Sequence, residues 1–203
     1  MGNNKKIQKL IKRQIDFWIA LLSLILLSPL FFLIAFLIKL DSRGPVFFLQ
    51  KRPGKDAKLF TIIKFRTMVE GAEKFGLDLN ENNPRTTRVG RFLRRWHLDE
   101  IPQLINILFG QMSLVGPRPP MIFQVNAENK FEKERFLVKP GLTGWAQIHG
   151  GNLLSWEERV KYDVWYAKNW SIWLDLKIFL ISLWKIIFLG KDLYKRKSNS
   201  KKL

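Results

Sequence analysis

The sequence of 203 residues contains no cysteine. Disulfide bonds and thiolate metal centres are therefore excluded, and nothing in the composition indicates an oxidising compartment. Acidic residues are scarce as well, because 17 Asp and Glu stand against 35 Lys and Arg and leave a formal charge of +18. This imbalance indicates phosphate-bearing partners, which include nucleic acid, anionic lipid and nucleotides.

The apolar content separates these classes of partner. Hydrophobic residues make up 47% of the chain, with eight Trp and sixteen Phe, which is a heavy apolar load for so basic a protein. A nucleic-acid-binding protein usually concentrates its charge around a smaller core, so we expect anionic membrane lipid, and no nucleic acid, as a partner. The length favours one domain with a substantial hydrophobic core.

A long hydrophobic run lies near the N-terminus, at residues 17–38. About 20 apolar residues suffice to cross a bilayer, so length alone permits a spanning helix. Lysine and arginine are plentiful on both sides of the run, at residues 5–13 and 39–58, and basic flanks prefer the cytoplasm. Both ends of the run are therefore expected on the same side of the membrane.

Pro29 stands near the middle of this run. Because proline has no amide hydrogen, the carbonyl of Ile25 loses its helical donor, and we expect a bend at Ser28–Pro29 where the Ser28 hydroxyl can satisfy the freed backbone. Each half is then roughly 17 Å long, too short to cross the hydrocarbon core. These features predict a re-entrant helical hairpin, with a kinked, spanning signal-anchor helix as the alternative.

Residues 170–189 combine a broad apolar surface with a narrow polar stripe of Asp175, Ser182 and Lys185. The pattern predicts an amphipathic helix, and its Trp and Lys residues suit the headgroup layer of a membrane. Burial of this helix in the protein core is the alternative. The basic residues 191–203 are expected to be disordered and attracted to anionic lipid.

In the middle of the chain, residues 44–68 alternate apolar and polar positions around a break at Pro53–Gly54, which predicts a hairpin of strands. Period-two alternation places Lys64 and Arg66 on one strand face and buries Phe65. Two cations on one face either build an anion site or form a solvated surface.

Arginine is concentrated in residues 85–95, which contain five of them after a turn at Asn83–Pro84. Guanidinium groups match phosphate geometry in a bidentate manner, so this cluster indicates a phosphate ligand. A sixth arginine, Arg118, follows Gly116 and Pro117 and precedes two prolines. Such a stiff turn either holds the guanidinium ready for a charged ligand or serves as a rigid connector.

Asp99 and Glu100 stand side by side after the arginine cluster. In one interpretation Asp99 is the N-cap of a helix that contains Pro102 in its first turn and ends at Gly110, since apolar residues recur there at helical spacing. In the other, the two carboxylates are catalytic. Mg²⁺ binds through one or two carboxylates together with substrate phosphates, and a carboxylate can also form a covalent phosphoryl intermediate.

A glycine-rich segment at residues 139–152 carries Thr143, Gln147 and His149, which are candidates for lining a pocket. Asp163 lies among aromatic residues, where a carboxylate needs a cationic partner.

Several of these stretches, in this order, strongly resemble the bacterial sugar transferases, or monotopic phosphoglycosyl transferases: KFRTM, LDEIPQLINIL, SLVGPRP, GLTGWAQI and YDVWYAKNWSIWLDLKI. The resemblance extends from about residue 12 to residue 189 and is closest to the minimal catalytic form. It implies transfer of a sugar 1-phosphate from a UDP-sugar to polyprenyl (undecaprenyl) phosphate with release of UMP, at the start of glycoconjugate synthesis. It also implies Mg²⁺ and a re-entrant helix at the cytoplasmic face of the bacterial inner membrane.

The resemblance assigns roles to individual residues. Asp99 is expected to be the nucleophile that forms the phosphosugar intermediate, and Glu100 its partner, with both as candidate Mg²⁺ ligands. Arg118 of the Pro-Arg-Pro turn is expected to contact the nucleotide or its phosphates. The further candidates for substrate binding are Lys64, Arg66, Arg94, Pro119 and Asp163.

Together these features predict an α+β, mostly helical, monotopic membrane protein. We expect a basic N-terminus and re-entrant helix at residues 1–40, a cytoplasm-facing catalytic domain with interfacial helices at 41–190, and a tail at 191–203. The expected partners are a UDP-sugar, polyprenyl phosphate and anionic lipid, and a homodimer is left open. The competing hypothesis is a non-catalytic scaffold or lipid-binding module at the membrane surface.

Overall fold

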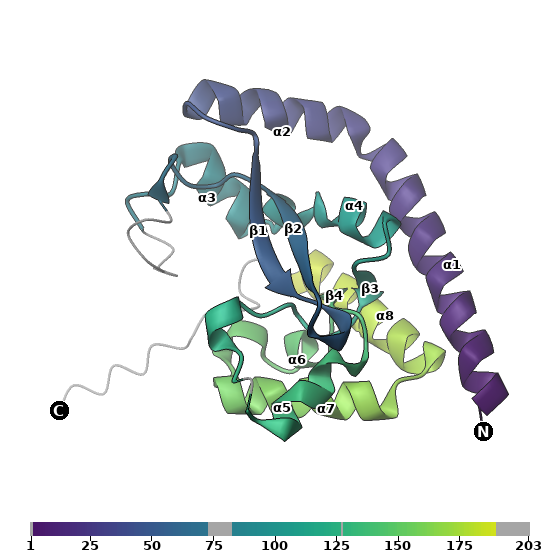
Figure 1. The fold of residues 1–203 in the computed structure, drawn as a ribbon. Helices are drawn as coiled ribbons and strands as arrows, with labels where there is room; N and C mark the ends of the chain where they lie inside the picture. The colour runs from purple at the N-terminus through teal and green to yellow at the C-terminus, as the bar shows by residue number, and fades with distance from the viewer. Residues whose placement is uncertain (1, 73–82, 127, 190–203) are drawn as a thin grey trace.

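The computed structural model describes residues 2–72, 83–126 and 128–189, so the expected tail at 191–203 lies outside the described residues. The described chain is mostly helical with two small two-stranded sheets, which confirms the α+β prediction (Figure 1). Its elements are α1 (Gly2–Leu26), α2 (Ser28–Asp41), β1 (Phe47–Pro53), β2 (Leu59–Phe65), α3 (Arg88–Arg95), α4 (Gln103–Leu108), β3 (Ser113–Val115), α5 (Lys130–Lys133), β4 (Gly141–Thr143), α6 (Trp145–Ile148), α7 (Trp156–Asn169) and α8 (Ile172–Leu189).

The helices α1 and α2 form a bent arch along the outside of the molecule (Figure 1). The bend is 61°, and the Ser28 hydroxyl donates to the carbonyl of Ile25 at 2.8 Å, as predicted for the backbone that Pro29 frees. In the described part of the chain no single helix is long and apolar enough to cross a membrane, whereas this bent pair meets both criteria together.

Charged side chains fasten the first half of α1 to the rest of the protein. Lys12 donates to the carbonyl of Val115 and pairs with Asp175 at 2.5 Å, and Asp16 accepts from the amide of Leu114. Arg13 donates to two carbonyls at the C-terminal end of α4, where helices leave acceptors without partners.

The second arm of the arch is fastened to the same body. Ile34 and Ile38 of α2 are buried with Phe65 of β2 and Leu93 of α3. Asp41, the last residue of α2, accepts from the amide of Val89 at 2.8 Å in the first turn of α3. Both ends of the arch are therefore attached to one folded unit.

The strands β1 and β2 pair antiparallel, and β1 ends at Pro53, so the predicted hairpin and its break are confirmed. The free edge of β2 is satisfied by a single buried side chain, Asn106 of α4, which accepts from the amide of Ile63 and donates to the carbonyl of Thr61. This amide fixes the hairpin against α4 and the turn that precedes it.

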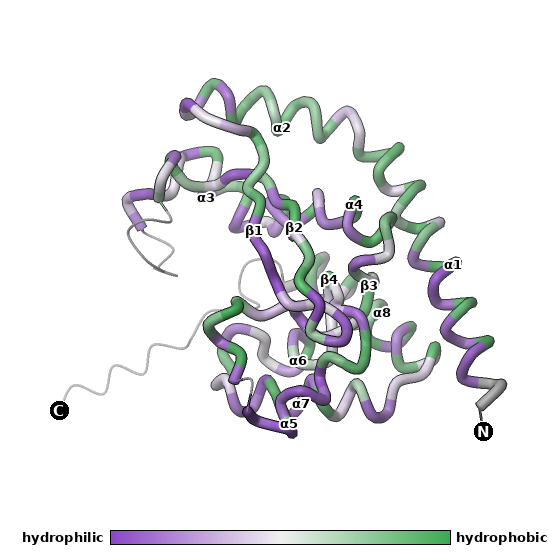
Figure 2. Tube along the Cα trace, viewed as in Figure 1, coloured by the Kyte–Doolittle hydropathy of each residue, from purple (hydrophilic) through white to green (hydrophobic). Residues whose placement is uncertain are grey.

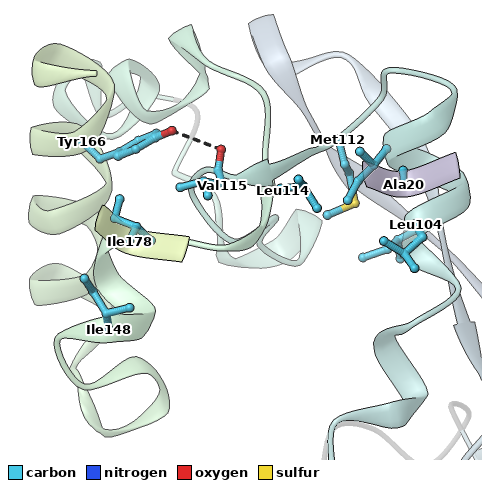
Figure 3. Close-up of a cluster of buried hydrophobic side chains, with 10 residues drawn as sticks. Ala20, Leu104, Met112, Leu114, Val115, Ile148, Tyr166 and Ile178 are labelled. Carbon is cyan, nitrogen blue, oxygen red and sulfur yellow. Dashed lines mark hydrogen bonds between the residues drawn. The ribbon is translucent and has the colours of Figure 1, made fainter. Parts of the chain in front are cut away.

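The main core lies where α1, α4, β3 and α8 meet, with Ala20, Met112 and Ile178 among its fully buried residues (Figure 3). Tyr166 of α7 closes this core, because its ring is buried and its hydroxyl donates to the carbonyl of Val115 at 3.1 Å.

The polar stripe of α8 faces the body of the protein. Asp175 accepts from Tyr166 and Trp170, the Ser182 hydroxyl meets that of Thr143, and Lys185 donates to a backbone carbonyl of α6. Large apolar side chains are exposed instead: Trp173, Leu176, Leu180, Leu183, Trp184, Ile186 and Phe188. The helix therefore packs one side on the body, with Ile178 in the core, and leaves a broad apolar surface exposed where a helix on a soluble domain would be polar.

The arch has a similar outer surface. Figure 2 shows hydrophobic residues along α2 and the second half of α1, and hydrophilic residues toward the start of α1. Contiguous apolar surface of this kind marks a contact with a membrane or another protein.

Candidate active site

The two adjacent carboxylates lie in a short turn between α3 and α4. This turn, Leu98–Glu100, is a single 3₁₀ turn, and α4 begins only at Gln103 with Pro102 at its N-cap position. Neither the turn nor α4 has a side-chain cap within the described chain, so the interpretation of Asp99 as a helix N-cap is wrong.

The turn is shaped by His97, whose backbone is in the left-handed region with φ of 54°. This conformation is unfavourable for a residue with a Cβ, and such outliers persist mainly where the surroundings enforce them, often at functional sites. It separates α3 from the turn and presents both carboxylates to the β2 side of the molecule.

Glu100 is held by two cations. Lys64 of β2 donates to it at 2.7 Å, and Arg118 binds both carboxylate oxygens with its two terminal nitrogens. The Glu100 side chain is only 12% exposed. Burial alone would raise the pKa of this carboxyl, but the charges and hydrogen bonds of Arg118 and Lys64 outweigh burial and hold the pKa well below its ordinary value.

Asp99 experiences the opposite balance. Burial and the neighbouring charge of Glu100 raise its pKa to about 6, against the opposing effect of Lys64, Arg118 and Arg94. Its negative charge is thus poorly compensated next to a carboxylate whose charge is well compensated. A buried, poorly compensated carboxylate is more basic and therefore more reactive.

The remaining predicted cations lie in two places. Arg94 of α3 donates to the Thr67 hydroxyl at 2.8 Å and acts electrostatically on Asp99, so it lies beside the two carboxylates. Arg66 instead donates to the carbonyls of Ser42 and Arg43, just after α2. The structure brings Lys64, Arg94 and Arg118 together around the carboxylates, and Arg66 makes its contacts at the end of α2.

Asp163 of α7 has the expected cationic partner, Arg135, and both side chains are 1% exposed. Arg135 also donates to the backbone carbonyl of Arg118 at 3.2 Å. The pair therefore supports the turn that carries Arg118. Burial raises the pKa of Asp163 to about 6 even though Arg135 and Arg159 favour its charged form.

Three arginines of the site were not predicted from the sequence: Arg52, Arg135 and Arg159. Arg52 of β1 donates to the carbonyl of Pro119 at 3.5 Å, and burial together with the charge of Arg118 lowers its pKa to about 10. Each of these arginines stands in a charged stretch that is typical of solvent-exposed surface. Their isolated positions carried no signal that would distinguish them from the many other basic residues.

Glycines let the Arg118 turn approach the glycine-rich segment closely. A Cβ on Gly116 would lie 2.4 Å from the carbonyl oxygen of Lys139, and one on Gly144 would lie 2.1 Å from that of Gly116. At these distances a Cβ atom would clash with backbone atoms, which cannot move aside as a flexible side chain can. The turn is therefore clamped, which agrees with the rigidity predicted from its prolines.

The cluster as a whole is strongly positive. Six buried or half-buried cations surround three carboxylates, which leaves an excess of three positive charges: Lys64, Arg52, Arg94, Arg118, Arg135 and Arg159 against Asp99, Glu100 and Asp163. Burial lowers the pKa of Arg52, Arg94 and Arg159, so their charge is costly without a ligand. An anion with several charges would compensate them.

A pocket of about 380 Å³ opens beside this cluster. Glu100, Arg118 and Arg159 line its charged end, and Thr143 and Gln147 of the glycine-rich segment also face it, as expected. His149 does not line this pocket, and its ring packs against Trp145 and Tyr162 instead. Most other lining residues are apolar and come from the bend after α1, the turn before α4, the strands β3 and β4, and the helices α4, α6 and α8. The arrangement suits an amphiphilic ligand with an anionic head.

The site offers few ligands for a metal ion. Among the described residues no group of three or more His, Cys, Asp and Glu side chains can hold a metal. Asp99 and Glu100 fit Mg²⁺ only in combination with substrate phosphate oxygens, which is a common way for this ion to bind.

Comparison with known proteins identifies relatives along nearly the whole chain. The family described as "Bacterial sugar transferase" matches residues 7–189. The chain is 42% identical over 178 residues to "Uncharacterized sugar transferase EpsL" of Bacillus subtilis (strain 168), covering 88% of each chain. It is 43% identical over 192 residues to "UDP-glucose:undecaprenyl-phosphate glucose-1-phosphate transferase" of Escherichia coli (strain K12), covering 88% of this chain and 40% of that relative.

A further relative is "UDP-N-acetylgalactosamine-undecaprenyl-phosphate N-acetylgalactosaminephosphotransferase" of Aeromonas hydrophila, which is 43% identical over 175 residues, covering 83% of this chain and 41% of the relative. The chain thus spans about two fifths of the length of the two relatives whose names state a substrate.

Proposed function

The chain belongs to the bacterial sugar transferase family, and on this premise we propose that it transfers a sugar 1-phosphate from a UDP-sugar to polyprenyl phosphate. The observation that carries the proposal is the position of Asp99 and Glu100. They lie inside a cluster with excess positive charge, and Glu100 lines the charged end of a largely apolar pocket with Asp99 next to it in the chain. A diphosphate donor and a lipid phosphate acceptor match these two features.

Asp99 is the nucleophile in this proposal. An oxygen of its carboxylate attacks the phosphorus that carries the sugar, the bond to the bridging oxygen breaks, and UMP leaves with that oxygen and its electron pair. An oxygen of polyprenyl phosphate then attacks the same phosphorus, the bond to Asp99 breaks, and the carboxylate is regenerated. The raised pKa of Asp99 supports this role, because it makes the carboxylate more basic.

The cations have separate tasks. Arg118, Lys64 and Arg94 bind the phosphates of the donor and offset the charge that develops on the transferred group. The Arg135–Asp163 pair and Arg52 hold the turn of Arg118 and Pro119 in place through its backbone carbonyls. Arg66 is retained among the proposed substrate-binding residues only through motif resemblance, because its hydrogen bonds lie at the end of α2.

Mg²⁺ is the proposed cofactor. Glu100 and Asp99 would hold it together with diphosphate oxygens, and its charge would help neutralise the leaving group. Because Glu100 already binds Lys64 and Arg118, we expect these cations to move toward the donor phosphates when the ion binds.

The proposed location is the cytoplasmic face of the bacterial inner membrane, with the arch of α1 and α2 as a re-entrant hairpin. Both arms are fastened to one body, α1 through Lys12 and Arg13 and α2 through Ile38 and Asp41, so they lie on the same side of a membrane. The basic flanks favour the cytoplasmic side. The exposed apolar faces of the arch and of α8 support membrane contact.

The test is to incubate the purified protein with a panel of UDP-sugars, with Mg²⁺ and with chelator, and to measure its intact mass without acceptor. We expect a sugar-phosphate adduct on the wild type with Mg²⁺, and none with chelator or with Asp99→Asn. Adding polyprenyl phosphate should discharge the adduct. A fully active Asp99→Asn variant would refute the nucleophile, and absence of both adduct and UMP release would refute the transferase.

A non-catalytic membrane scaffold is the competing function. It accounts for the exposed apolar faces but leaves the buried excess of positive charge without a ligand. Nucleotide-dependent turnover separates the two, and a homodimer stays a prediction.

A further inference from the structure

The pocket beside the carboxylates reaches from the charged cluster to the arch. Its far wall includes Ser23 of α1, Leu27 at the bend, and Phe179, Leu183 and Ile186 of α8. Leu183 and Ile186 are also part of the exposed apolar face of α8. The apolar end of the pocket is therefore continuous with the surfaces that the proposed function assigns to the membrane.

One cation at the charged end has no carboxylate of its own. Arg118 pairs with Glu100 and Arg135 pairs with Asp163, but Arg159 of α7 makes no ion pair within the described residues. Arg159 donates one hydrogen bond, to the carbonyl of Gly151 at 3.0 Å, and its Nε is buried without a partner there. A half-buried guanidinium in this state requires an anion.

Gln147 of α6 lines the same pocket and is also unsatisfied. Both its side-chain oxygen and its nitrogen are buried without a hydrogen-bond partner in the described chain. Leaving such groups unpaired is unfavourable, so a ligand that satisfies them gains affinity. The Gln147 amide and the Arg159 guanidinium line one pocket, and both are donors that suit a phosphate.

We propose that Arg159 and Gln147 bind the phosphate of the lipid acceptor, and that its first isoprenoid units lie between the bend of the arch and α8. This inference rests on the proposed function and adds an acceptor site separate from the donor site at Lys64, Arg94 and Arg118. The far wall carries Leu27, Phe179, Leu183 and Ile186, which suit an isoprenoid chain, and its polar side chains Ser23, Ser182 and Lys185 are few beside them. The acceptor phosphate would then reach the Asp99 adduct from the membrane side.

Photo-crosslinking tests the site without any need for turnover. The probe is geranylgeranyl phosphate with a diazirine in its second isoprene unit, added to wild-type protein in nanodiscs. We expect labelled peptides from residues 17–28 and 179–186, loss of labelling with excess undecaprenyl phosphate, and little effect of inorganic phosphate or UDP. Labelling only outside these segments, or protection by UDP or by inorganic phosphate alone, would overturn the proposal.

Two variants on α7 separate the acceptor site from the donor site. In Arg159→Ala we expect the adduct to form from the UDP-sugar within about twofold of the wild-type rate, and the KM for polyprenyl phosphate to rise at least about tenfold, with partial rescue in Arg159→Lys. The control is Lys161→Ala, an exposed position two residues away, which should leave both steps unchanged. Equal slowing of adduct formation and discharge in Arg159→Ala would place this arginine in the donor site.

These experiments distinguish failure of the proposed function from failure of the acceptor site. A wild type that labels in the pocket but forms no adduct contradicts the proposed function and keeps the lipid site. A wild type that forms and discharges the adduct but labels elsewhere contradicts only the acceptor site.

Discussion

At the scale of single residues, the adjacent carboxylates Asp99 and Glu100 have opposite environments. Arg118 and Lys64 satisfy the oxygens of Glu100, whereas Asp99 receives burial and the repulsion of its neighbour without an equal share of those cations. Separation of two pKa values in this way is how enzymes assign different tasks to similar groups. It supports the proposed role of Asp99 as nucleophile on physical grounds that do not depend on motif resemblance.

This separation is measurable in the metal-free protein. We expect an apparent pKa of about 6 for Asp99, read from the carboxyl ¹³C shift of labelled Asp and assigned by its loss in Asp99→Asn. Glu100→Gln removes a negative charge and releases Arg118 and Lys64 toward Asp99. Both changes favour the charged form, so the pKa of Asp99 should fall. An ordinary pKa in the wild type, or a rise in Glu100→Gln, would contradict this electrostatic account.

The buried Arg135–Asp163 pair predicts a large effect on stability. Asp163→Asn leaves the guanidinium buried without its counter-charge, so we expect the free energy of unfolding at pH 7.5 to fall by about 3–5 kcal/mol in denaturant titrations. The matched control is Glu134→Gln, which breaks the more exposed pair with Lys168 and should cost less than about 1 kcal/mol.

A double variant separates support of the site from stability. Arg135→Met with Asp163→Leu replaces the pair by apolar groups and should recover most of the lost stability. Activity should stay low, because the carbonyl of Arg118 no longer has its donor. Full activity in this double variant would show that the pair serves stability alone.

At the scale of elements, the break between α1 and α2 is what places both arms on one side of the membrane in the proposed re-entrant arrangement. Because the chain has no cysteine, single cysteines at Lys9 and Lys58 report topology without background. We expect a membrane-impermeant maleimide to label both in inverted vesicles and neither in intact spheroplasts. Labelling of the two positions from opposite sides would contradict the re-entrant arrangement.

Restoring the helix should change this result. Ser28→Ala with Pro29→Ala returns the amide donor to Ile25 and joins the apolar residues into one helix of about 33 Å, long enough to span. A fraction of the chains should then expose Lys9→Cys to the maleimide outside.

Elements with a strong local signal could be predicted from the sequence. The bend at Pro29, the hairpin broken at Gly54 and the helix of residues 172–189 each follow from backbone chemistry or periodicity. The three-residue strands β3 and β4 could not, because parallel pairing joins segments far apart and leaves no pattern in so short a stretch. The helix predicted to begin at Asp99 begins only at Gln103. The helical spacing of apolar residues continues back through Leu98–Glu100, but these residues form a separate turn after the left-handed residue His97.

The residues of the site also divide into those with a local sequence signal and those without one. Asp99, Glu100 and Arg118 stand in distinctive local sequences, and the cationic partner of Asp163 follows from the cost of a buried carboxylate. Arg135 and Arg159 could not be found in this way. The chain has 35 basic residues, and nothing in the local sequence of these two shows that folding turns them inward. Residues whose role depends on tertiary contacts carry no signal of their own.

At the scale of the whole molecule, the apolar faces of the arch and α8 and the charge of +18 both favour a membrane, but through different forces. Electrostatic attraction to anionic lipid is screened by salt, whereas burial of apolar surface is not. Because the polar stripe of α8 is already hydrogen-bonded to the body, the exposed face of this helix is apolar apart from Lys177. We therefore expect association with zwitterionic liposomes to persist in high salt.

Substitutions on the exposed face of α8 test this directly. Leu180 and Trp184 are 54% and 53% exposed, so Leu180→Glu with Trp184→Glu should change the free energy of unfolding in detergent by less than about 1 kcal/mol. On a membrane each lost side chain removes roughly 1.5–3 kcal/mol of burial, so flotation with liposomes at high salt should show at least about a tenfold loss of partitioning. Lys133→Gln with Lys161→Gln lowers the net charge by the same two units at exposed positions away from α8 and should float like the wild type. If the α8 variant floats equally well, this helix does not contact the membrane, and the arch alone anchors the protein.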